Sequence, residues 1–318
     1  ANLLSSARAE AVTGGALTEY SDTLEVAVAE NFDLGESPIW DARSDTLLFV
    51  DCSRGHIHRF IPDDGSIATL EIGQIIGAVL PCLNSDLVVT SGDGLLLCDK
   101  AGVTRLLVPI EPDLAANRMN DGKCDSRGRL WSGTFSTLFH RGAGSLYRID
   151  PDLTFTRAVS NVRVSNGIGW NGDETRMYFV DTLSGGIDVF DYDIDTGTVS
   201  NRSQFVAIAR EEGLPDGLAV DAEGCVWVAL FFGGEVRRYS PRGRLIGKLT
   251  LPVARVTSCN FGGQNLRDLF ITTASFKPQE DGCSHEPEAG YVFRCSPGVT
   301  GLPSQPFGYL PRQNPMRE

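Results

Sequence analysis

The sequence has no long uninterrupted apolar run and few basic residues. No stretch approaches the length needed to cross a membrane, so a membrane-spanning protein is not expected. Residues 1–15 have no continuous apolar core and carry Arg8 and Glu10 in their middle, unlike a targeting segment. Lys and Arg total 28 against 41 Asp and Glu, which gives a formal charge of −13. This balance argues against nucleic acid or an anionic membrane as partner and favours a cation.

Several catalytic signatures are also missing. There is no Gly-x-Ser-x-Gly elbow, and none of the four histidines lies in a recognisable triad setting, which argues against nucleophilic catalysis by serine or cysteine. Gly92-Asp-Gly94 lacks the further glycines of a phosphate-binding loop. The eight cysteines include no Cys-x-x-Cys spacing, and Cys98 and Cys225 lie inside apolar strands where a reduced thiol packs well. This pattern predicts a cytoplasmic protein.

Turn residues are abundant, with 35 Gly and 16 Pro, and long amphipathic helical patterns are scarce, so an all-β fold is favoured. A turn followed by an apolar strand recurs along the chain. The copies are at residues 41–50, 125–131, 171–180 and 221–228, with weaker ones at 84–89 and 262–271. Their spacing of roughly 40 to 50 residues is the period of propeller blades. The sequence therefore predicts a single domain over 1–318, a six-bladed β-propeller with four-stranded antiparallel blades.

A circular array must join its first and last blades or leave open sheet edges. Leu24 to Ala29 alternates between apolar and polar residues as a strand does. We expect the segment 24–32 to close the ring by pairing with the last blade near 290–295. Residues 1–20 are then expected to form an N-terminal extension.

Four polar residues share one offset from the turns. Each lies five residues before a turn-forming Asp or Asn; they are Glu36, Asn120, Asn166 and Asp216, before Asp41, Asp125, Asn171 and Asp221. The first strand of each blade lines the central channel of a propeller, so equivalent positions converge there. By the same offset, the weaker units contribute Val79 and Thr257. The four polar residues are thus expected to form a ring of oxygen ligands.

An alternative interpretation of this pattern is purely structural. Asn166-Gly167 and Asp216-Gly217 are common hairpin-turn dipeptides. A turn does not explain the shared offset, nor Glu36, which lacks a following glycine. Two other signals are discounted: the segment 191–197, which imitates a calcium loop, is interpreted as a blade turn, and His56 and His58 as a packed or solvated pair.

Four ordered motifs carry a resemblance over nearly the whole chain. They are Leu34-Gly-Glu-Ser-Pro-Ile-Trp40, Arg118-Met-Asn-Asp-Gly-Lys-Cys-Asp125, Ser165-Asn-Gly-Ile-Gly-Trp170 and Leu214-Pro-Asp-Gly-Leu-Ala-Val-Asp221. The chain resembles the regucalcin and gluconolactonase family. The resemblance implies a six-bladed propeller that hydrolyses sugar lactones, with a divalent metal bound by Glu36, Asn166 and Asp216. It also implies proton transfer by Asp216 and substrate binding by Arg118 and Asn120, with Asn120 a further candidate ligand before substrate binds.

The donor set limits the choice of metal. Two carboxylates and amide oxygens are hard ligands that suit Ca²⁺, Mg²⁺ or Mn²⁺, with Ca²⁺ favoured and Zn²⁺ an alternative. Arg118 and Asn120 are two residues apart on a strand and point to one side, where the arginine could bind lactone oxygens or a product carboxylate. The alternative for Arg118 is a structural ion pair with Asp121.

The chain departs from the family pattern at one place. Animal members of the family carry an acidic residue shortly after a Gly-Thr pair, but Gly133-Thr134 is followed here by Phe135 and no acid up to His140. Phe135, His140 and Arg141 are candidates for lining the substrate entrance instead, which leaves the identity of the lactone open. Two other functions stay open: a calcium-binding regulatory protein without turnover, and a propeller hydrolase of other esters or organophosphates.

Overall fold

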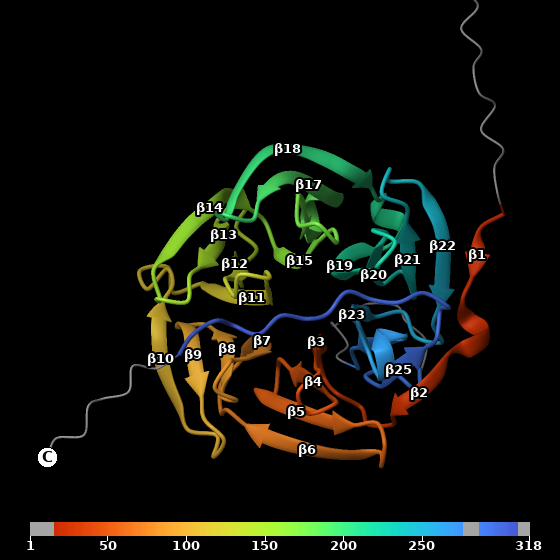
Figure 1. Ribbon diagram of the computed structural model, residues 1–318, viewed down its shortest axis with the longest axis horizontal. Coiled ribbons are helices and arrows are strands. Elements are labelled where there is room, and N and C mark those ends of the chain that lie inside the picture. Colours follow the sequence, from red (N-terminus) through yellow and green to blue (C-terminus); the bar gives the residue numbers. More distant parts are fainter. Residues whose placement is uncertain (1–15, 276–285, 311–318) are drawn as a thin grey trace, which may run out of the picture.

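The computed structural model describes residues 16–275 and 286–310. Within them, 25 strands form six sheets arranged around a central axis (Figure 1), which confirms the predicted six-bladed β-propeller. Four short 3₁₀ helices lie in the connections: η1 (Ser21–Thr23), η2 (Thr182–Ser184), η3 (Arg210–Glu212) and η4 (Gln264–Leu266). None of the described helices is long and apolar enough to cross a membrane.

The first three blades are built from consecutive antiparallel strands, with the first strand of each blade innermost. Blade one contains β3 (Gly35–Asp41), β4 (Thr46–Asp51), β5 (His56–Ile61) and β6 (Ser66–Glu71). Blade two contains β7 (Ile76–Pro81), β8 (Leu87–Ser91), β9 (Gly94–Cys98) and β10 (Thr104–Pro109). Blade three contains β11 (Asn117–Cys124), β12 (Leu130–Ser136), β13 (Gly144–Ile149) and β14 (Phe155–Val162).

The remaining blades follow the same order, with additions from the N-terminal segment. Blade four contains β15 (Ser165–Trp170), β16 (Arg176–Asp181), β17 (Gly186–Asp193) and β18 (Thr198–Ala207). Blade five contains β19 (Leu214–Val220), β20 (Val226–Phe231), β21 (Glu235–Tyr239), β22 (Leu245–Thr250) and the added β1 (Thr18–Glu19). Blade six contains β23 (Val256–Gly262), β24 (Asp268–Thr273), β25 (Val292–Cys295) and, from the N-terminal segment, β2 (Glu25–Val28).

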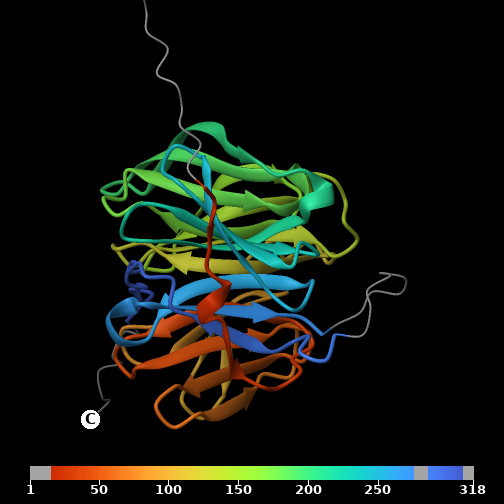
Figure 2. The same cartoon turned by 90° about the vertical axis from the view of Figure 1, so that its right-hand side faces the viewer.

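The N-terminal segment closes the ring where the alternation of residues 24–29 predicts a strand. β2 pairs antiparallel with β25, so that Val26 lies opposite Phe293. Thr18 and Glu19 do not belong to an extension, because β1 pairs in parallel with β22 of blade five. The segment therefore crosses from blade six to blade five on the outside of the ring (Figure 2). Residues 1–15 of the expected extension lie outside the described residues.

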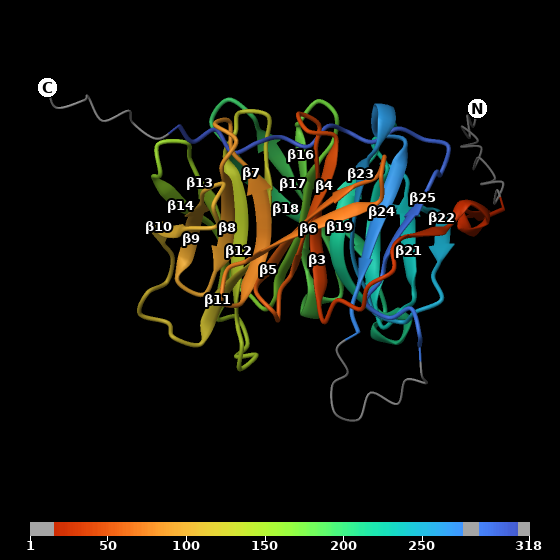
Figure 3. The same ribbon diagram turned by 90° about the horizontal axis from the view of Figure 1, so that it is seen from below.

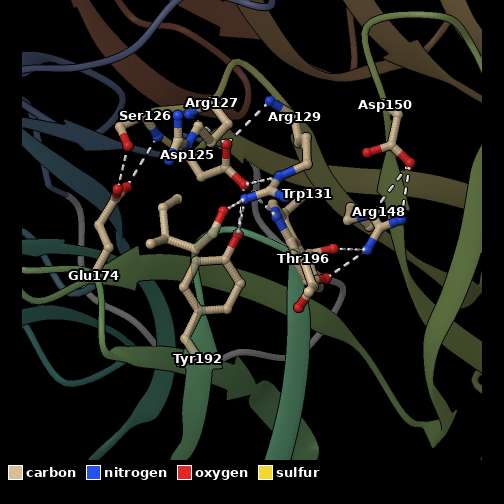
Figure 4. A network of polar contacts seen from close by, with 12 residues as sticks. Asp125, Ser126, Arg127, Arg129, Trp131, Arg148, Asp150, Glu174, Tyr192 and Thr196 are labelled. Carbon is tan, nitrogen blue, oxygen red and sulfur yellow. Dashed lines mark hydrogen bonds and ion pairs between the residues drawn. The ribbon is translucent and has the colours of Figure 1, made fainter.

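The repeated spacing of the turns has a structural cause in the buried turn aspartates. Asp125 accepts hydrogen bonds at Oδ1 from the main-chain amides of Arg127 and Arg129. Its Oδ2 accepts from Arg129 Nε at 2.7 Å, Trp131 Nε1 at 3.2 Å and Tyr192 Oη at 2.5 Å (Figure 4). One carboxylate thus shapes the turn and joins blade three to blade four, which stabilises both.

The two faces of the ring differ. The C-terminal segment runs across the face where the inner strands end (Figures 1 and 3), with Gly301 bridged to Asp221 and Phe307 bridged to Cys82. The opposite face carries the starts of the inner strands. A ligand can therefore approach the start of the inner strands without meeting the C-terminal segment.

The described cysteines agree with the expectation of reduced, buried thiols. Seven of the eight lie in described residues, and all seven are free and buried. Burial raises the pKa of the Cys98 thiol to about 11, which keeps it protonated and unreactive.

Candidate functional site

A β-bulge near the start of each inner strand positions the candidate site residues. In β3, Glu36 pairs with Val50 and Ile39 with Leu48, so two residues oppose one. The same slip occurs between Met119 and Gly122, between Ser165 and Ile168, and between Pro215 and Leu218. Asn120, Asn166 and Asp216 lie inside these bulges, and Glu36 flanks its own. Bulges redirect side chains out of the regular alternation, and here the redirected side chains include those of Asn120, Asn166 and Asp216.

The second blade corrects the predicted ring position Val79. Cys82, not Asn84, stands where blades one, three and five have the turn aspartate: its amide donates to Asp86 O at 2.8 Å, as the Asp125 amide donates to the oxygen of Arg129 at 3.1 Å. The residue five positions earlier is Gly77, which lies in the bulge, while Val79 follows the bulge and is buried in the apolar core.

Gly77 lies close to the main chain of the neighbouring blade three. A Cβ at this position would lie 2.6 Å from the main-chain oxygen of Asn120. The second blade therefore contributes no side chain at this position, because the main chain of Asn120 occupies the space that a side chain would need. In the sixth blade the predicted position was right, since Thr257 lies in the bulge of β23 and donates from Oγ1 to Gly35 O at 2.5 Å.

The two candidate carboxylate ligands are buried and lie close to one another. Glu36 is 8% exposed and Asp216 is 7% exposed. Burial, followed by the nearby charge of Asp121, raises the pKa of Glu36 to about 8. The pKa of Asp216 is also raised, by burial first and then by the charge of Glu36, and contact with Asn166 partly offsets this. Three negative groups packed together in a low-dielectric site call for a positive partner.

Two oxygen atoms in this group lack partners. Asn166 Oδ1 and Asp216 Oδ1 are buried and accept no hydrogen bond from the described residues. The amide of Asn166 is nevertheless oriented, because its Nδ2 donates to Thr182 Oγ1 at 3.1 Å. Buried acceptors without donors are costly, and a bound cation would satisfy both oxygens. The donor set fits a divalent cation, which would also hold the carboxylates in their charged form.

Arg118 and Asn120 lie next to this group, as the sequence predicts. Asn120 Nδ2 donates to Ser165 O at 2.9 Å, and Arg118 Nη1 donates to Asn120 Oδ1 at 3.4 Å and to Met119 O at 3.2 Å. The guanidinium lies 4.6 Å from the ring centre of Phe135. The alternative ion pair between Arg118 and Asp121 is not formed among the described residues. Burial lowers the pKa of Arg118, and the nearby charge of Glu36 partly offsets this effect.

Sequence reasoning missed two residues of the channel. Asp121 is buried and accepts a hydrogen bond from the amide of Gly122 at 2.8 Å. Its charge contributes, after burial, to the raised pKa values of Glu36 and Asp216. Lys123 donates from Nζ to Leu218 O at 2.8 Å, and burial lowers its pKa. Both follow Asn120 on the same inner strand. The run Asn-Asp-Gly-Lys in an otherwise apolar channel strand was the available signal.

The candidate entrance residues separate into two groups. Phe135 is only 8% exposed and lies against Arg118 rather than at the surface. His140 and Arg141 are exposed on the loop that follows β12. The same loop exposes Leu138 at 65% and Phe139 at 63%, two apolar residues that the sequence analysis did not single out.

An acidic group outside the ring has a structural explanation. Ligand atoms of Asp221, Glu223 and Cys225 lie within 4.8 Å of one another. However, Arg238 Nη2 donates at 2.7 Å to Asp221 and at 2.7 Å to Glu223. Asp221 also accepts from Trp227 Nε1 at 2.9 Å. The guanidinium supplies the positive charge here, so this is a turn anchor equivalent to that of Asp125.

The other two discounted signals are also structural. Asp193 Oδ1 accepts from the amides of Asp195 and Thr196 in the turn between β17 and β18, which confirms a blade turn. His58 is buried against Phe32, at 4.6 Å between ring centres, and Nδ1 is 3.0 Å from Thr69 Oγ1. His58 is therefore a packed core histidine.

Comparison with known proteins gives a consistent result. Chicken (Gallus gallus) regucalcin is 35% identical over 292 residues, 89% of this chain and 98% of the relative. The structure of a calcium-binding protein, regucalcin from Agrobacterium tumefaciens, has a TM-score of 0.86 and 28% identity and covers 92% of this chain and 99% of its own. A luciferin-regenerating enzyme has a TM-score of 0.81 and 30% identity, with 90% and 97% covered. Residues 34–275 match the SMP-30/gluconolactonase/LRE-like region, and the chain therefore belongs to the SMP-30/gluconolactonase/LRE-like family.

Proposed function

We propose that this protein is a divalent-metal-dependent hydrolase that opens sugar-type lactones to aldonic acids. The observation that carries the proposal is the pair of buried, unpartnered oxygens of Asn166 and Asp216 beside the carboxyl of Glu36. Membership of a family that includes gluconolactonases supports the reaction class. The acidic charge of the chain fits a small-molecule substrate and neither nucleic acid nor a membrane, and the free buried thiols fit the cytoplasm.

Glu36, Asn166 and Asp216 would hold the metal, with Asn120 as a further candidate ligand. Hard carboxylate and amide oxygens favour Ca²⁺, with Mg²⁺, Mn²⁺ or Zn²⁺ as alternatives. When bound, the cation supplies Lewis acidity that polarises the lactone carbonyl and stabilises the negative charge that develops on its oxygen.

The protein's own residues orient the lactone and move the proton. The guanidinium of Arg118 is held by Met119 O and by the ring of Phe135, which leaves further N–H donors for a lactone oxygen. Asp216 takes a proton from the attacking water while the oxygen of that water forms a bond to the carbonyl carbon of the lactone. The ring C–O bond then breaks, and the proton returns to the released hydroxyl group. Water is consumed and a hydroxy acid forms.

The experiment uses protein treated with a chelator and assayed with a pH indicator on five- and six-membered aldonolactones. Ca²⁺, Mg²⁺, Mn²⁺ and Zn²⁺ are restored separately. Turnover that depends on the restored metal supports the proposal and identifies the preferred lactone. Metal binding without turnover of any lactone would instead favour the calcium-binding role that the Agrobacterium relative's name describes, or an ester outside the sugar series.

A further inference from the structure

A line of contacts leads from the candidate metal site to the protein surface. Arg118 donates to Asn120 Oδ1 at 3.4 Å and lies 4.6 Å from the ring centre of Phe135, and the ring centres of Phe135 and Phe139 are 6.1 Å apart. Phe139 is 63% exposed, and its neighbour Leu138 is 65% exposed. The loop that follows β12 extends from the face of the ring opposite the C-terminal segment (Figure 3). An apolar surface, formed by Leu138 and Phe139 and here called the apolar lip, thus continues outward from Arg118.

Hydrogen bonds hold this loop in a defined conformation. The amide of Thr137 donates to Ala116 O at 2.7 Å, and its Oγ1 donates to the same oxygen at 2.9 Å. The amide of Phe139 donates to Ser136 O at 2.7 Å. Phe139 has a φ of 53°, a left-handed conformation that a phenylalanine seldom adopts. Strained residues that the surrounding structure holds in place occur preferentially at ligand-binding sites.

We propose that the apolar lip binds an apolar substituent of the substrate, so that the lactone is amphipathic. The oxygen-rich ring of the lactone lies at Arg118, Asn120 and the metal ligands, and an alkyl, acyl or aryl group extends over Phe135 onto Phe139. This inference rests on the proposed function, since it names the substrate class of the same site. The occupant is a small molecule because the lip continues directly from the substrate-binding arginine.

The geometry suits such a substrate better than a fully hydroxylated one. A sugar hydroxyl placed against Leu138 or Phe139 would lose water without gaining a hydrogen bond. An apolar group would instead remove exposed apolar surface from water on both partners. Because the loop is already held in place, little conformational entropy is lost on binding. The lip therefore favours substrates with an apolar extension.

The test measures binding without turnover. Two ring amides that resist hydrolysis, 5-methyl- and 5-hexyl-2-pyrrolidinone, are titrated into the Ca²⁺-loaded full-length protein by calorimetry. Each fully buried methylene tightens binding roughly fourfold, so partial burial of the longer chain should give about tenfold tighter binding of the hexyl compound. In Phe139→Ser this ratio is expected to fall to about twofold. Phe155→Ser is the matched control, since Phe155 is 47% exposed on the outer strand β14.

The results separate this inference from the proposed function. A hexyl preference that is lost in Phe139→Ser and kept in Phe155→Ser supports the inference that the apolar lip binds an apolar substituent. Equal binding of the two amides, or no binding of the hexyl compound, overturns it even if sugar lactones are hydrolysed. A hexyl preference in a protein that hydrolyses no lactone with any metal supports the lip and overturns the lactonase proposal instead.

Discussion

Lys123 of β11 donates a hydrogen bond to the main-chain oxygen of Leu218 on β19 at 2.8 Å, although these strands belong to blades three and five. The lysine therefore crosses the central channel. It joins the strand that carries Asn120 to the strand that carries Asp216. The distance between two of the candidate ligand positions thus depends on a side chain that contacts neither of them directly.

Replacing Lys123 with methionine should destabilise the protein by about 2–3 kcal/mol, because a buried carbonyl loses a charged donor and Asp121 loses its nearby positive charge. Denaturant unfolding measures the effect. Lys248→Met is the control: Lys248 is partly exposed, 3.8 Å from Glu19, and its loss should cost less than about 0.5 kcal/mol. Equal effects of the two variants would contradict the role of Lys123 as a cross-channel tie.

Asp216→Asn should abolish lactone hydrolysis and weaken metal binding, because it removes the proton acceptor and one negative ligand. Glu36→Gln should weaken metal binding by the loss of one charge and reduce turnover at a fixed metal concentration. Metal affinity by calorimetry and initial rates by pH indicator measure these effects. His56→Ala should leave both quantities unchanged. Full activity in Asp216→Asn would rule out the proposed catalytic role.

Asp221→Ala should lower the free energy of unfolding by about 3–5 kcal/mol, because Arg238 would be left buried without its carboxylate. Glu223→Ala removes only a partner whose side chain is 63% exposed, and its cost should be below about 1 kcal/mol. Thermal and denaturant unfolding compare the two. A lower number of bound metal ions in the folded Glu223→Ala protein would show that this cluster is a metal site and not a turn anchor.

His58 should make stability depend on pH. Burial lowers its pKa to about 4, whereas an unfolded histidine takes up a proton near pH 6.5. Between these values the unfolded chain binds more protons, so stability should decrease as the pH falls from about 7 to 4. In His58→Gln the decrease should be smaller, while His56→Gln should retain it. Parallel profiles of denaturant midpoint against pH for wild type and His58→Gln would disprove this.

The sequence was informative about the site because the site residues belong to the repeat. An Asp or Asn holds the turn of each strong blade, and Asp41, Asp125 and Asp221 also bind a neighbouring indole or guanidinium, so this local requirement repeats along the chain. The ring residue lies five positions before this turn residue in each strong blade, so it repeats with the same period. Where the anchor is absent, as at Cys82, the count from the sequence started from the wrong residue and selected Val79 in place of Gly77.

Residues 24–29 were recognisable as the closing strand because alternation with a period of two is a local property of half-buried strands. The pairing of Thr18 and Glu19 with blade five was not recognisable, since a strand of two residues is too short to show an alternation of apolar and polar residues.

The six-bladed architecture, the closing strand and the candidate ring positions Glu36, Asn166 and Asp216 could therefore be predicted from the chain alone, because repetition and alternation are properties of the local order of residues. Three features became visible only in the folded protein: which buried oxygens accept no hydrogen bond, the reach of Lys123 across the channel, and the contact of Phe135 with Arg118 while Phe139 is exposed. These properties depend on contacts between distant parts of the chain and on how much water each group retains. These contacts, and the burial of each group from water, form only when the blades have closed into a ring.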